Sequence, residues 1–147
     1  MSDPLTDLDA LHEVISATPF GLLADLDGTL SPLAGSPAEA RVSPRNLELL
    51  NQLSRRCLTA VVSGRDLPDL KRIVALPSIV YVGLHGAAWN VDGQDRLVPE
   101  AEPYRAFTAE AARDLAPLDG RDGIFVELKT VGIALHYRGA RRPPGSR

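Results

Sequence analysis

The sequence predicts a doubly wound α/β fold with its functional residues at one edge of a parallel sheet. Three short apolar runs, residues 21–24, 58–62 and 79–82, have the composition of strands buried on both faces. Helical patterns separate them, which gives the strand–helix order of a parallel sheet. A polar cluster directly follows each run. Because ligands bind at the carboxyl ends of parallel strands, we expect these clusters to form one site.

Three helices are expected in the first part of the chain. Two of them begin with a helix-capping residue followed by proline, at Asp3–Pro4 and at Ser43–Pro44. In all three, apolar side chains recur every three or four residues. These side chains are Leu5, Leu8, Leu11 and Ile15, then Leu47, Leu50 and Leu53, and finally Leu67, Leu70, Ile73 and Val74. Residues 31–42 contain prolines, serines and a glycine, and are expected to form a loop.

The pattern changes after Gly86. Asp92–Gly93 is a hairpin-turn signal between two short apolar runs, and an Ala- and Glu-rich helix is expected over 103–115. Two strand-like runs follow, at 124–129 and 132–137. We therefore expect residues 1–87 to belong to the first unit and residues 88–140 to a partial second unit of α+β type. Residues 141–147 lack core-forming side chains and are expected to be a disordered tail.

Composition points to an ordinary globular protein. The chain has 147 residues, a net charge of −3 and 44% hydrophobic residues. No basic block indicates nucleic-acid binding, the acidic N-terminus does not have the pattern of a signal peptide, and no apolar run has membrane-spanning length. We expect a cytoplasmic monomer that binds neither nucleic acid nor membranes. Neither Cys/His zinc spacing nor the phosphate loop of NTPases is present.

Asp25 and Asp27 are the first candidates for catalysis. They follow the first apolar run, and Gly28 allows the chain to fold back closely behind them. One carboxylate of such a pair can attack phosphorus while the other transfers a proton, and carboxylate oxygens suit Mg²⁺. Asp–Gly alone is more typical of an ordinary turn. The full pattern of an apolar strand followed by Asp-x-Asp-Gly-Thr-Leu favours phosphoryl chemistry.

Ser63, Gly64 and Arg65 follow the second apolar run. A hydroxyl, free backbone N–H groups and a helix N-terminus can bind phosphate, and arginine can bind an anion in bidentate fashion. His85 follows the third run, between glycines. A simple Ser/Gly turn and a structural histidine remain alternatives at these two positions.

Glu127 and Lys129 alternate with apolar residues, so their side chains project from one face of a strand, and His136 and Arg138 do the same on the next. This face could bind a ligand rich in hydroxyl groups. The pattern alone favours a solvated outer face.

Together these motifs resemble a known family. Residues 25–30 are similar to the first motif of the haloacid-dehalogenase superfamily, and Ser63 to its second. More narrowly, four segments in order resemble trehalose-6-phosphate phosphatases: Val62-Ser63-Gly64-Arg65, Gly83-Leu84-His85-Gly86, Glu127-Leu128-Lys129 and His136-Tyr137-Arg138. The resemblance implies a Rossmann-like haloacid-dehalogenase core and the start of a cap domain that grips the sugar.

The resemblance also implies roles for individual residues. Asp25 would be the nucleophile and Asp27 the general acid/base, with Mg²⁺ bound by Asp25 and the main-chain carbonyl of Asp27. Ser63, with Gly28, Thr29 and Gly64, would bind phosphate. Arg65, His85, Glu127 and Lys129 would bind the rest of a sugar-phosphate substrate, trehalose 6-phosphate.

The chain also departs from the family. A later lysine and a later Gly-Asp-Asp motif, which complete the phosphate and Mg²⁺ sites in the family, do not occur. The resemblance therefore implies a fragment ending in the cap, with weak or no activity and poor solubility. The alternatives are another sugar-phosphate phosphatase of the superfamily, of the sucrose or mannosylglycerate type, or a non-catalytic α/β module that binds a phosphosugar or a protein.

Overall fold

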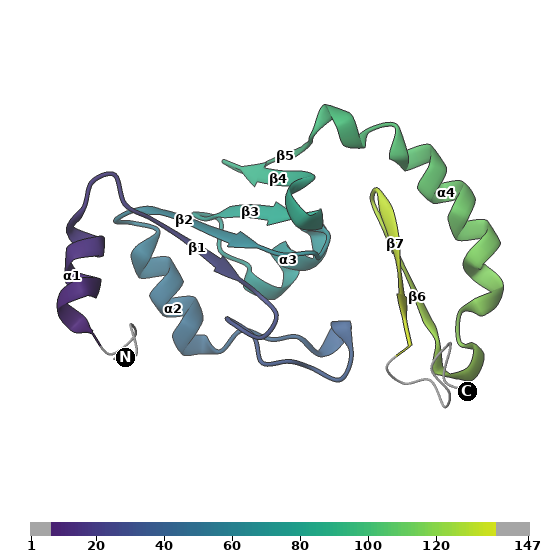
Figure 1. Ribbon diagram of the computed structural model, residues 1–147, viewed down its shortest axis with the longest axis horizontal. Helices are drawn as coiled ribbons and strands as arrows, with labels where there is room; N and C mark the ends of the chain where they lie inside the picture. The colour runs from purple at the N-terminus through teal and green to yellow at the C-terminus, as the bar shows by residue number, and fades with distance from the viewer. Residues whose placement is uncertain (1–6, 138–147) are drawn as a thin grey trace.

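The computed structural model describes residues 7–137, which form two sheets (Figure 1). The five-stranded sheet has the order β1 (Gly21–Asp25), β2 (Leu58–Val62), β3 (Val80–Gly83), β4 (Ala88–Val91) and β5 (Gln94–Leu97). The two-stranded sheet is a hairpin of β6 (Phe125–Lys129) and β7 (Gly132–His136). The α-helices are α1 (Leu8–Ser16), α2 (Pro44–Leu53), α3 (Leu67–Val74) and α4 (Tyr104–Leu115). The predicted Asp3–Pro4 cap, Arg138 and the 141–147 tail lie outside the described residues.

The first three strands confirm the predicted α/β core. β1 pairs in parallel with β2, and β2 with β3, with α2 and α3 as the crossover helices. Ser43 caps α2 as predicted, accepting a hydrogen bond from the N–H of Asn46. The hydrophobic core joins Leu50 of α2 and Leu70 of α3 to Val61 and Tyr81 of the sheet.

Both crossover helices pack on one face of the sheet. Right-handed crossovers that proceed in one direction, from β1 to β2 to β3, place successive helices on the same side. On the opposite face Leu23 is 67% exposed, although the sequence predicted a strand buried on both faces. The second helical layer of a doubly wound sheet is therefore not among residues 7–137, and β1 is an edge strand of this sheet.

The β4–β5 hairpin belongs to the first sheet. Its turn is at the predicted Asp92–Gly93, but β4 pairs antiparallel with β3, with Val82 opposite Trp89. Residues 88–97, which the sequence assigned to the second unit, thus extend the first sheet. A hairpin signal specifies the pairing of its own two strands and does not specify which sheet they extend.

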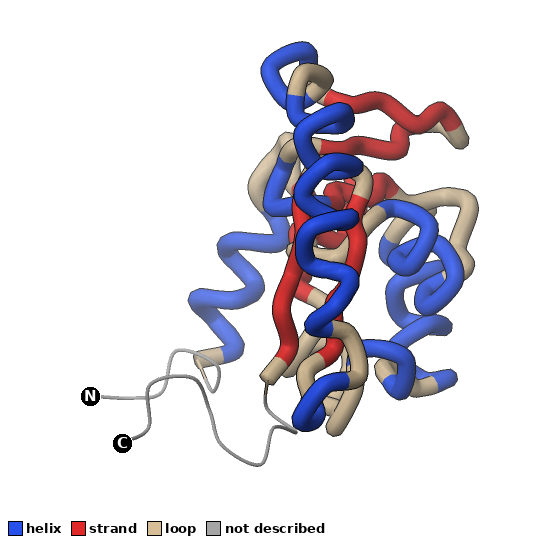
Figure 2. The backbone as a smooth tube through the Cα atoms, turned by 90° about the vertical axis from the view of Figure 1, so that its right-hand side faces the viewer, coloured by secondary structure: helices blue, strands red, loops and turns tan. Residues whose placement is uncertain are grey.

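The second group of elements is α4 with the β6–β7 hairpin. Helix α4 covers the side of the hairpin that faces away from the five-stranded sheet (Figures 1 and 2). The opposite side of the hairpin lies toward the carboxyl ends of β1–β3 (Figure 1). The hairpin is thus placed to contribute side chains to a site at that edge.

Tyr81 allows a pH-dependent test of the core. Its hydroxyl donates to the Leu76 carbonyl oxygen at 2.8 Å and accepts from the Leu76 N–H at 2.9 Å. Burial raises the pKa of Tyr81, and its hydrogen bond to Leu76 only partly offsets this. The unfolded chain therefore loses this proton at a lower pH than the folded protein does. The contribution of Tyr81 to stability is then complete below about pH 10 and is lost as the pH rises further.

We expect urea unfolding of the wild type and of Tyr81→Phe to show this difference. Above about pH 10, the free energy of unfolding should fall more steeply with pH in the wild type than in the variant. Parallel pH dependences of the two proteins would contradict the burial of this hydroxyl.

Candidate active site

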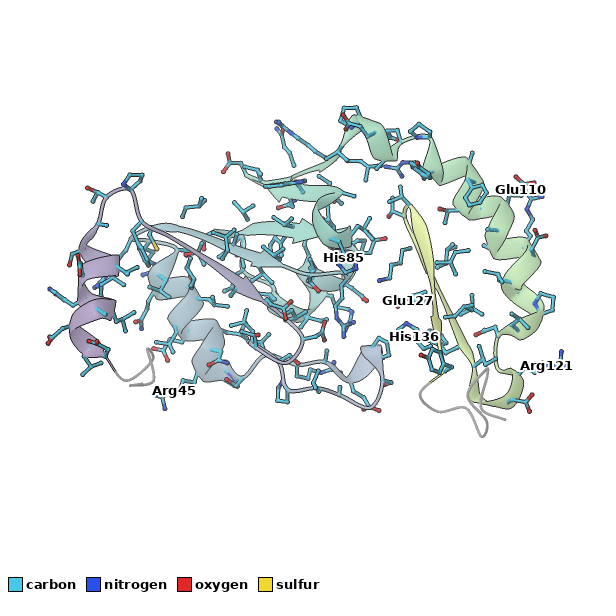
Figure 3. All side chains as sticks on the ribbon, viewed as in Figure 1. Arg45, His85, Glu110, Arg121, Glu127 and His136 are labelled. Atoms are coloured by element: carbon cyan, nitrogen blue, oxygen red, sulfur yellow. The ribbon has the colours of Figure 1, made fainter. Side chains whose placement is uncertain are left out.

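The candidate site lies at the carboxyl ends of β1, β2 and β3. Asp25 is the last residue of β1, Ser63 directly follows β2, and His85 lies just after β3. Because Asp25 pairs in register with Val62, Ser63 follows directly beside it. Figure 3 shows His85 at this edge and Glu127 and His136 on the hairpin opposite, directed toward it. The structure therefore brings together the segments that the sequence singled out.

The turn after β1 is fixed by its own backbone hydrogen bonds. The Leu26 carbonyl accepts from the N–H groups of Leu30 and Ser31, at 3.1 and 2.8 Å. Gly28 has a φ of +88°, a conformation that favours glycine, and its N–H donates to the Ser31 carbonyl at 2.7 Å. Gly28 was predicted to bind phosphate, but in this conformation its N–H already has a hydrogen-bond partner. The N–H of Thr29 lies 3.4 Å from the Leu26 carbonyl, which is a long hydrogen bond.

Asp27 is held by Arg65. The guanidinium Nε lies 2.8 Å from Oδ2 of Asp27 and Nη2 lies 2.9 Å from Oδ1, a bidentate ion pair. Nη1 donates to the Pro37 carbonyl at 2.8 Å. The hydrogen bond to Asp27 is the main cause that raises the pKa of Arg65, and burial acts in the opposite direction. Arg65 therefore stays cationic and is committed to Asp27, whereas the sequence predicted that it contacts substrate.

The Asp27 side chain is partly buried, and the Asp25 carboxylate belongs to an exposed residue. Within residues 7–137 the hydrogen bonds do not include one to this carboxylate, and the main-chain carbonyl of Asp27 also accepts none. Both groups are hard oxygen donors of the kind that Mg²⁺ prefers. The described residues contain no cluster of three or more His, Cys, Asp or Glu side chains that could hold a metal ion. The fit to Mg²⁺ therefore depends on these two oxygen donors alone.

Ser63 and Gly64 pack closely against His85. The Ser63 hydroxyl accepts from the N–H of Arg65 at 3.2 Å, and its carbonyl accepts from the N–H of His85 at 3.1 Å. His85 has a φ of 55°, and its ring lies directly over Gly64. A Cβ atom on residue 64 would lie 2.4 Å from Cε1 of that ring. Glycine is therefore required here for the histidine to approach the loop.

The hairpin places charged side chains on the face that points to the core. Its register puts Phe125 opposite His136 and Glu127 opposite Ala134, so Glu127 and His136 share a face, as the sequence predicted. Nε2 of His136 lies 2.6 Å from Oε2 of Glu127. Nζ of Lys129 donates to the Gly64 carbonyl at 2.7 Å. This face is thus directed at the core, and is not the solvated outer face that the alternation alone favoured.

Sequence reasoning missed the hydrogen-bond partners that hold these side chains. Asp66 caps α3 and also binds Thr130, and the Pro37 carbonyl accepts from Arg65. Asp66 precedes Leu67–Pro68, so a capping residue before proline was available as a signal for the start of α3. The pairings with residues distant in sequence had no such signal.

Comparison with known proteins identifies the family. A model of the trehalose-phosphatase family matches residues 23–146, most of the chain. The chain belongs to the trehalose-phosphatase family. A curated relative, trehalose-phosphate phosphatase of Mycobacterium tuberculosis, is 37% identical over 147 residues. That alignment covers 97% of this chain and 37% of the relative, so the chain spans just over a third of the length of that enzyme.

Solved structures agree with this family fold. A trehalose-6-phosphate phosphatase related protein matches with a TM-score of 0.73 at 24% identity, over 79% of this chain and 51% of that one. The C-terminal domain of the Candida albicans trehalose-6-phosphate phosphatase matches with a TM-score of 0.68 at 25% identity, over 80% and 42% of the two chains. The α/β core predicted from the sequence is thus the fold of these trehalose-phosphatases. None of the helices described in this chain is long and apolar enough to cross a membrane.

Gly64→Ala should displace the His85 ring, because the new methyl group would occupy the space of the imidazole. We expect the Cε1–H resonance of His85 to shift in a carbon–proton correlation spectrum of the variant. Gly132→Ala is the matched control, since a Cβ there meets nothing within 4 Å. An unchanged His85 resonance in Gly64→Ala would contradict the packing described here.

Proposed function

We propose that this chain carries the nucleophile and the sugar-binding hairpin of a trehalose-6-phosphate phosphatase. The reaction would be the hydrolysis of trehalose 6-phosphate to trehalose and phosphate, a step of trehalose biosynthesis. The proposal depends most on two aspartates at the same edge of the sheet. Asp25 is exposed there, and Asp27 is held by Arg65. Family membership and the charged face of the hairpin above this pair support it.

The chemistry divides between the two aspartates. A carboxylate oxygen of Asp25 attacks phosphorus, and the bond between phosphorus and the sugar oxygen breaks as Asp27 donates a proton to that oxygen. Water then attacks the aspartyl-phosphate, and Asp27 takes the proton of the water as the phosphate leaves Asp25. Both oxygens of Asp27 accept from Arg65, which suits the ionised form that acts in the second step. In the first step Arg65 has to release one of these oxygens.

Mg²⁺ would be held by the Asp25 carboxylate and the Asp27 main-chain carbonyl. When bound, it offsets the negative charge of the phosphoryl group. The division into a core, over residues 1–87 together with the β4–β5 hairpin, and a partial cap over the remainder up to residue 140 belongs to the same proposal.

The remaining side chains would bind the phosphate and the sugar. In this proposal, the phosphate accepts hydrogen bonds from the Ser63 hydroxyl and from the N–H groups of Gly64 and Thr29. Gly28 would act through the conformation of the turn, because its own N–H is used. Glu127 and Lys129 would contact sugar hydroxyls, and His85 would lie between phosphate and sugar.

Asp25→Asn should abolish formation of the covalent intermediate, because a neutral amide does not attack phosphorus. The measurement is phosphorylation of the chain by trehalose 6-phosphate and Mg²⁺, read by mass spectrometry after acid quenching. We expect phosphate on Asp25 in the wild type, slower labelling in Asp27→Asn, which lacks the proton donor of the first step, and none in Asp25→Asn. Sucrose 6-phosphate and a phosphorylated mannosylglycerate complete the substrate panel. Faster labelling by either of these, or labelling of Asp25→Asn, would contradict the proposal.

Arg65→Lys tests the role of Arg65. A single ammonium group cannot hold both oxygens of Asp27, so proton transfer should suffer. We expect the single-turnover rate of Asp25 phosphorylation at saturating trehalose 6-phosphate to fall about tenfold or more, with little change in the concentration for half-saturation. Arg105→Lys is the control, because Arg105 forms an exposed ion pair with Glu102 at the start of α4. An unchanged rate with weaker half-saturation would instead support the direct substrate contact predicted from the sequence.

A further inference from the structure

The tip of the β6–β7 hairpin is attached to the loop that follows β2. Thr130 lies in the turn between the two strands, and its N–H donates to Oδ2 of Asp66 at 2.7 Å. The hydroxyl of Thr130 donates to the same oxygen at 2.6 Å. The other oxygen of Asp66, Oδ1, accepts from the N–H of Leu67 at 2.9 Å and so caps α3. One carboxylate thus links the first turn of a core helix to the hairpin.

Lys129 strengthens this attachment. Its ammonium group donates to the Gly64 carbonyl at 2.7 Å, two residues before Asp66. Among residues 7–137, the hydrogen bonds that join the hairpin to the core all end on these two residues of the β2–α3 loop. The hairpin is otherwise connected to the core through the chain that contains α4 (Figure 1). Its position over the site therefore depends on this small set of contacts.

We infer that Asp66 is the anchor that holds the hairpin over Asp25 and Asp27, and that Thr130 is a positioning residue for Lys129 and Glu127. Lys129 and Glu127 occupy alternate positions on the strand that ends beside Thr130, so fixing Thr130 fixes the end from which both project. A carboxylate that accepts two hydrogen bonds from one residue makes a stronger contact than a neutral acceptor does. Asp66 is pre-oriented for it by its hydrogen bond to α3.

The expected effect on substrate binding rests on the proposed function, whereas the contact between Asp66 and Thr130 does not. If the hairpin binds the sugar and the core binds the phosphate, loss of the anchor should weaken binding of the whole sugar phosphate. Binding of inorganic phosphate, which needs only the core, should not change. This difference separates a positioning role from a general loss of folding.

The contact is tested by hydrogen exchange of the Thr130 amide in the 147-residue chain, followed by nuclear magnetic resonance. In Asp66→Ala both acceptor oxygens of this side chain are lost, and we expect exchange of the Thr130 amide to be about tenfold faster. Thr130→Val leaves Asp66 and its cap of α3 intact, and removes only the hydroxyl. Thr130→Ser keeps the hydroxyl and is the matched control. A Thr130 amide that exchanges equally fast in the wild type and in Asp66→Ala would overturn the inference.

Binding is then measured by calorimetry with trehalose 6-phosphate and with inorganic phosphate, both in the presence of Mg²⁺. For Thr130→Val we expect about three- to tenfold weaker binding of trehalose 6-phosphate, unchanged binding of phosphate, and wild-type affinity in Thr130→Ser. If Thr130→Val weakens neither ligand, or weakens both equally, Thr130 does not position Lys129 and Glu127. If the wild type protects the Thr130 amide but does not bind trehalose 6-phosphate, the proposed function is wrong and the anchor stands.

Discussion

The β2–α3 loop, residues 63–66, is the segment on which the rest of the site depends. Its four residues contact three other parts of the chain. Ser63 fixes the backbone of His85, and Gly64 accepts from Lys129. Arg65 holds Asp27, and Asp66 holds Thr130. The loop after β1, the loop after β3 and the hairpin are thus all positioned relative to one short segment between a buried strand and a helix.

The physical reason lies in the parallel sheet. Carboxyl ends of neighbouring parallel strands place successive loops side by side, so a loop that follows the middle strand can reach both neighbours. A buried arginine needs its charge and hydrogen bonds satisfied, and Asp27 together with the Pro37 carbonyl does so. The cost of burying Arg65 is therefore compensated by a contact that also orients the candidate acid/base. Among residues 7–137 Asp25 has no such partner, and it is exposed.

The sequence was sufficient for the local elements. Apolar runs, the Ser43 cap and turn signals predicted strands and helices, and strict alternation predicted that Glu127 and Lys129 share a face. Helix α1 differs from the prediction, because it begins at Leu8 with Asp7 as its cap and not at Asp3–Pro4. What it did not predict were pairings between distant segments. The β4–β5 hairpin joins β3 because of tertiary pairing that its own residues do not encode locally. The Arg65–Asp27 and Asp66–Thr130 contacts likewise join residues 38 and 64 positions apart. Periodicity carries no information at such separations.

The central claim is that one site forms where the core edge and the hairpin meet around the β2–α3 loop. The most direct test is a crystal structure of Asp25→Asn, which cannot turn over, in complex with trehalose 6-phosphate and Mg²⁺. The account predicts the phosphoryl group between residue 25 and Ser63, and the disaccharide against Glu127 and Lys129. A structure in which the sugar does not contact the hairpin, or in which the phosphate lies away from residue 25, would contradict it.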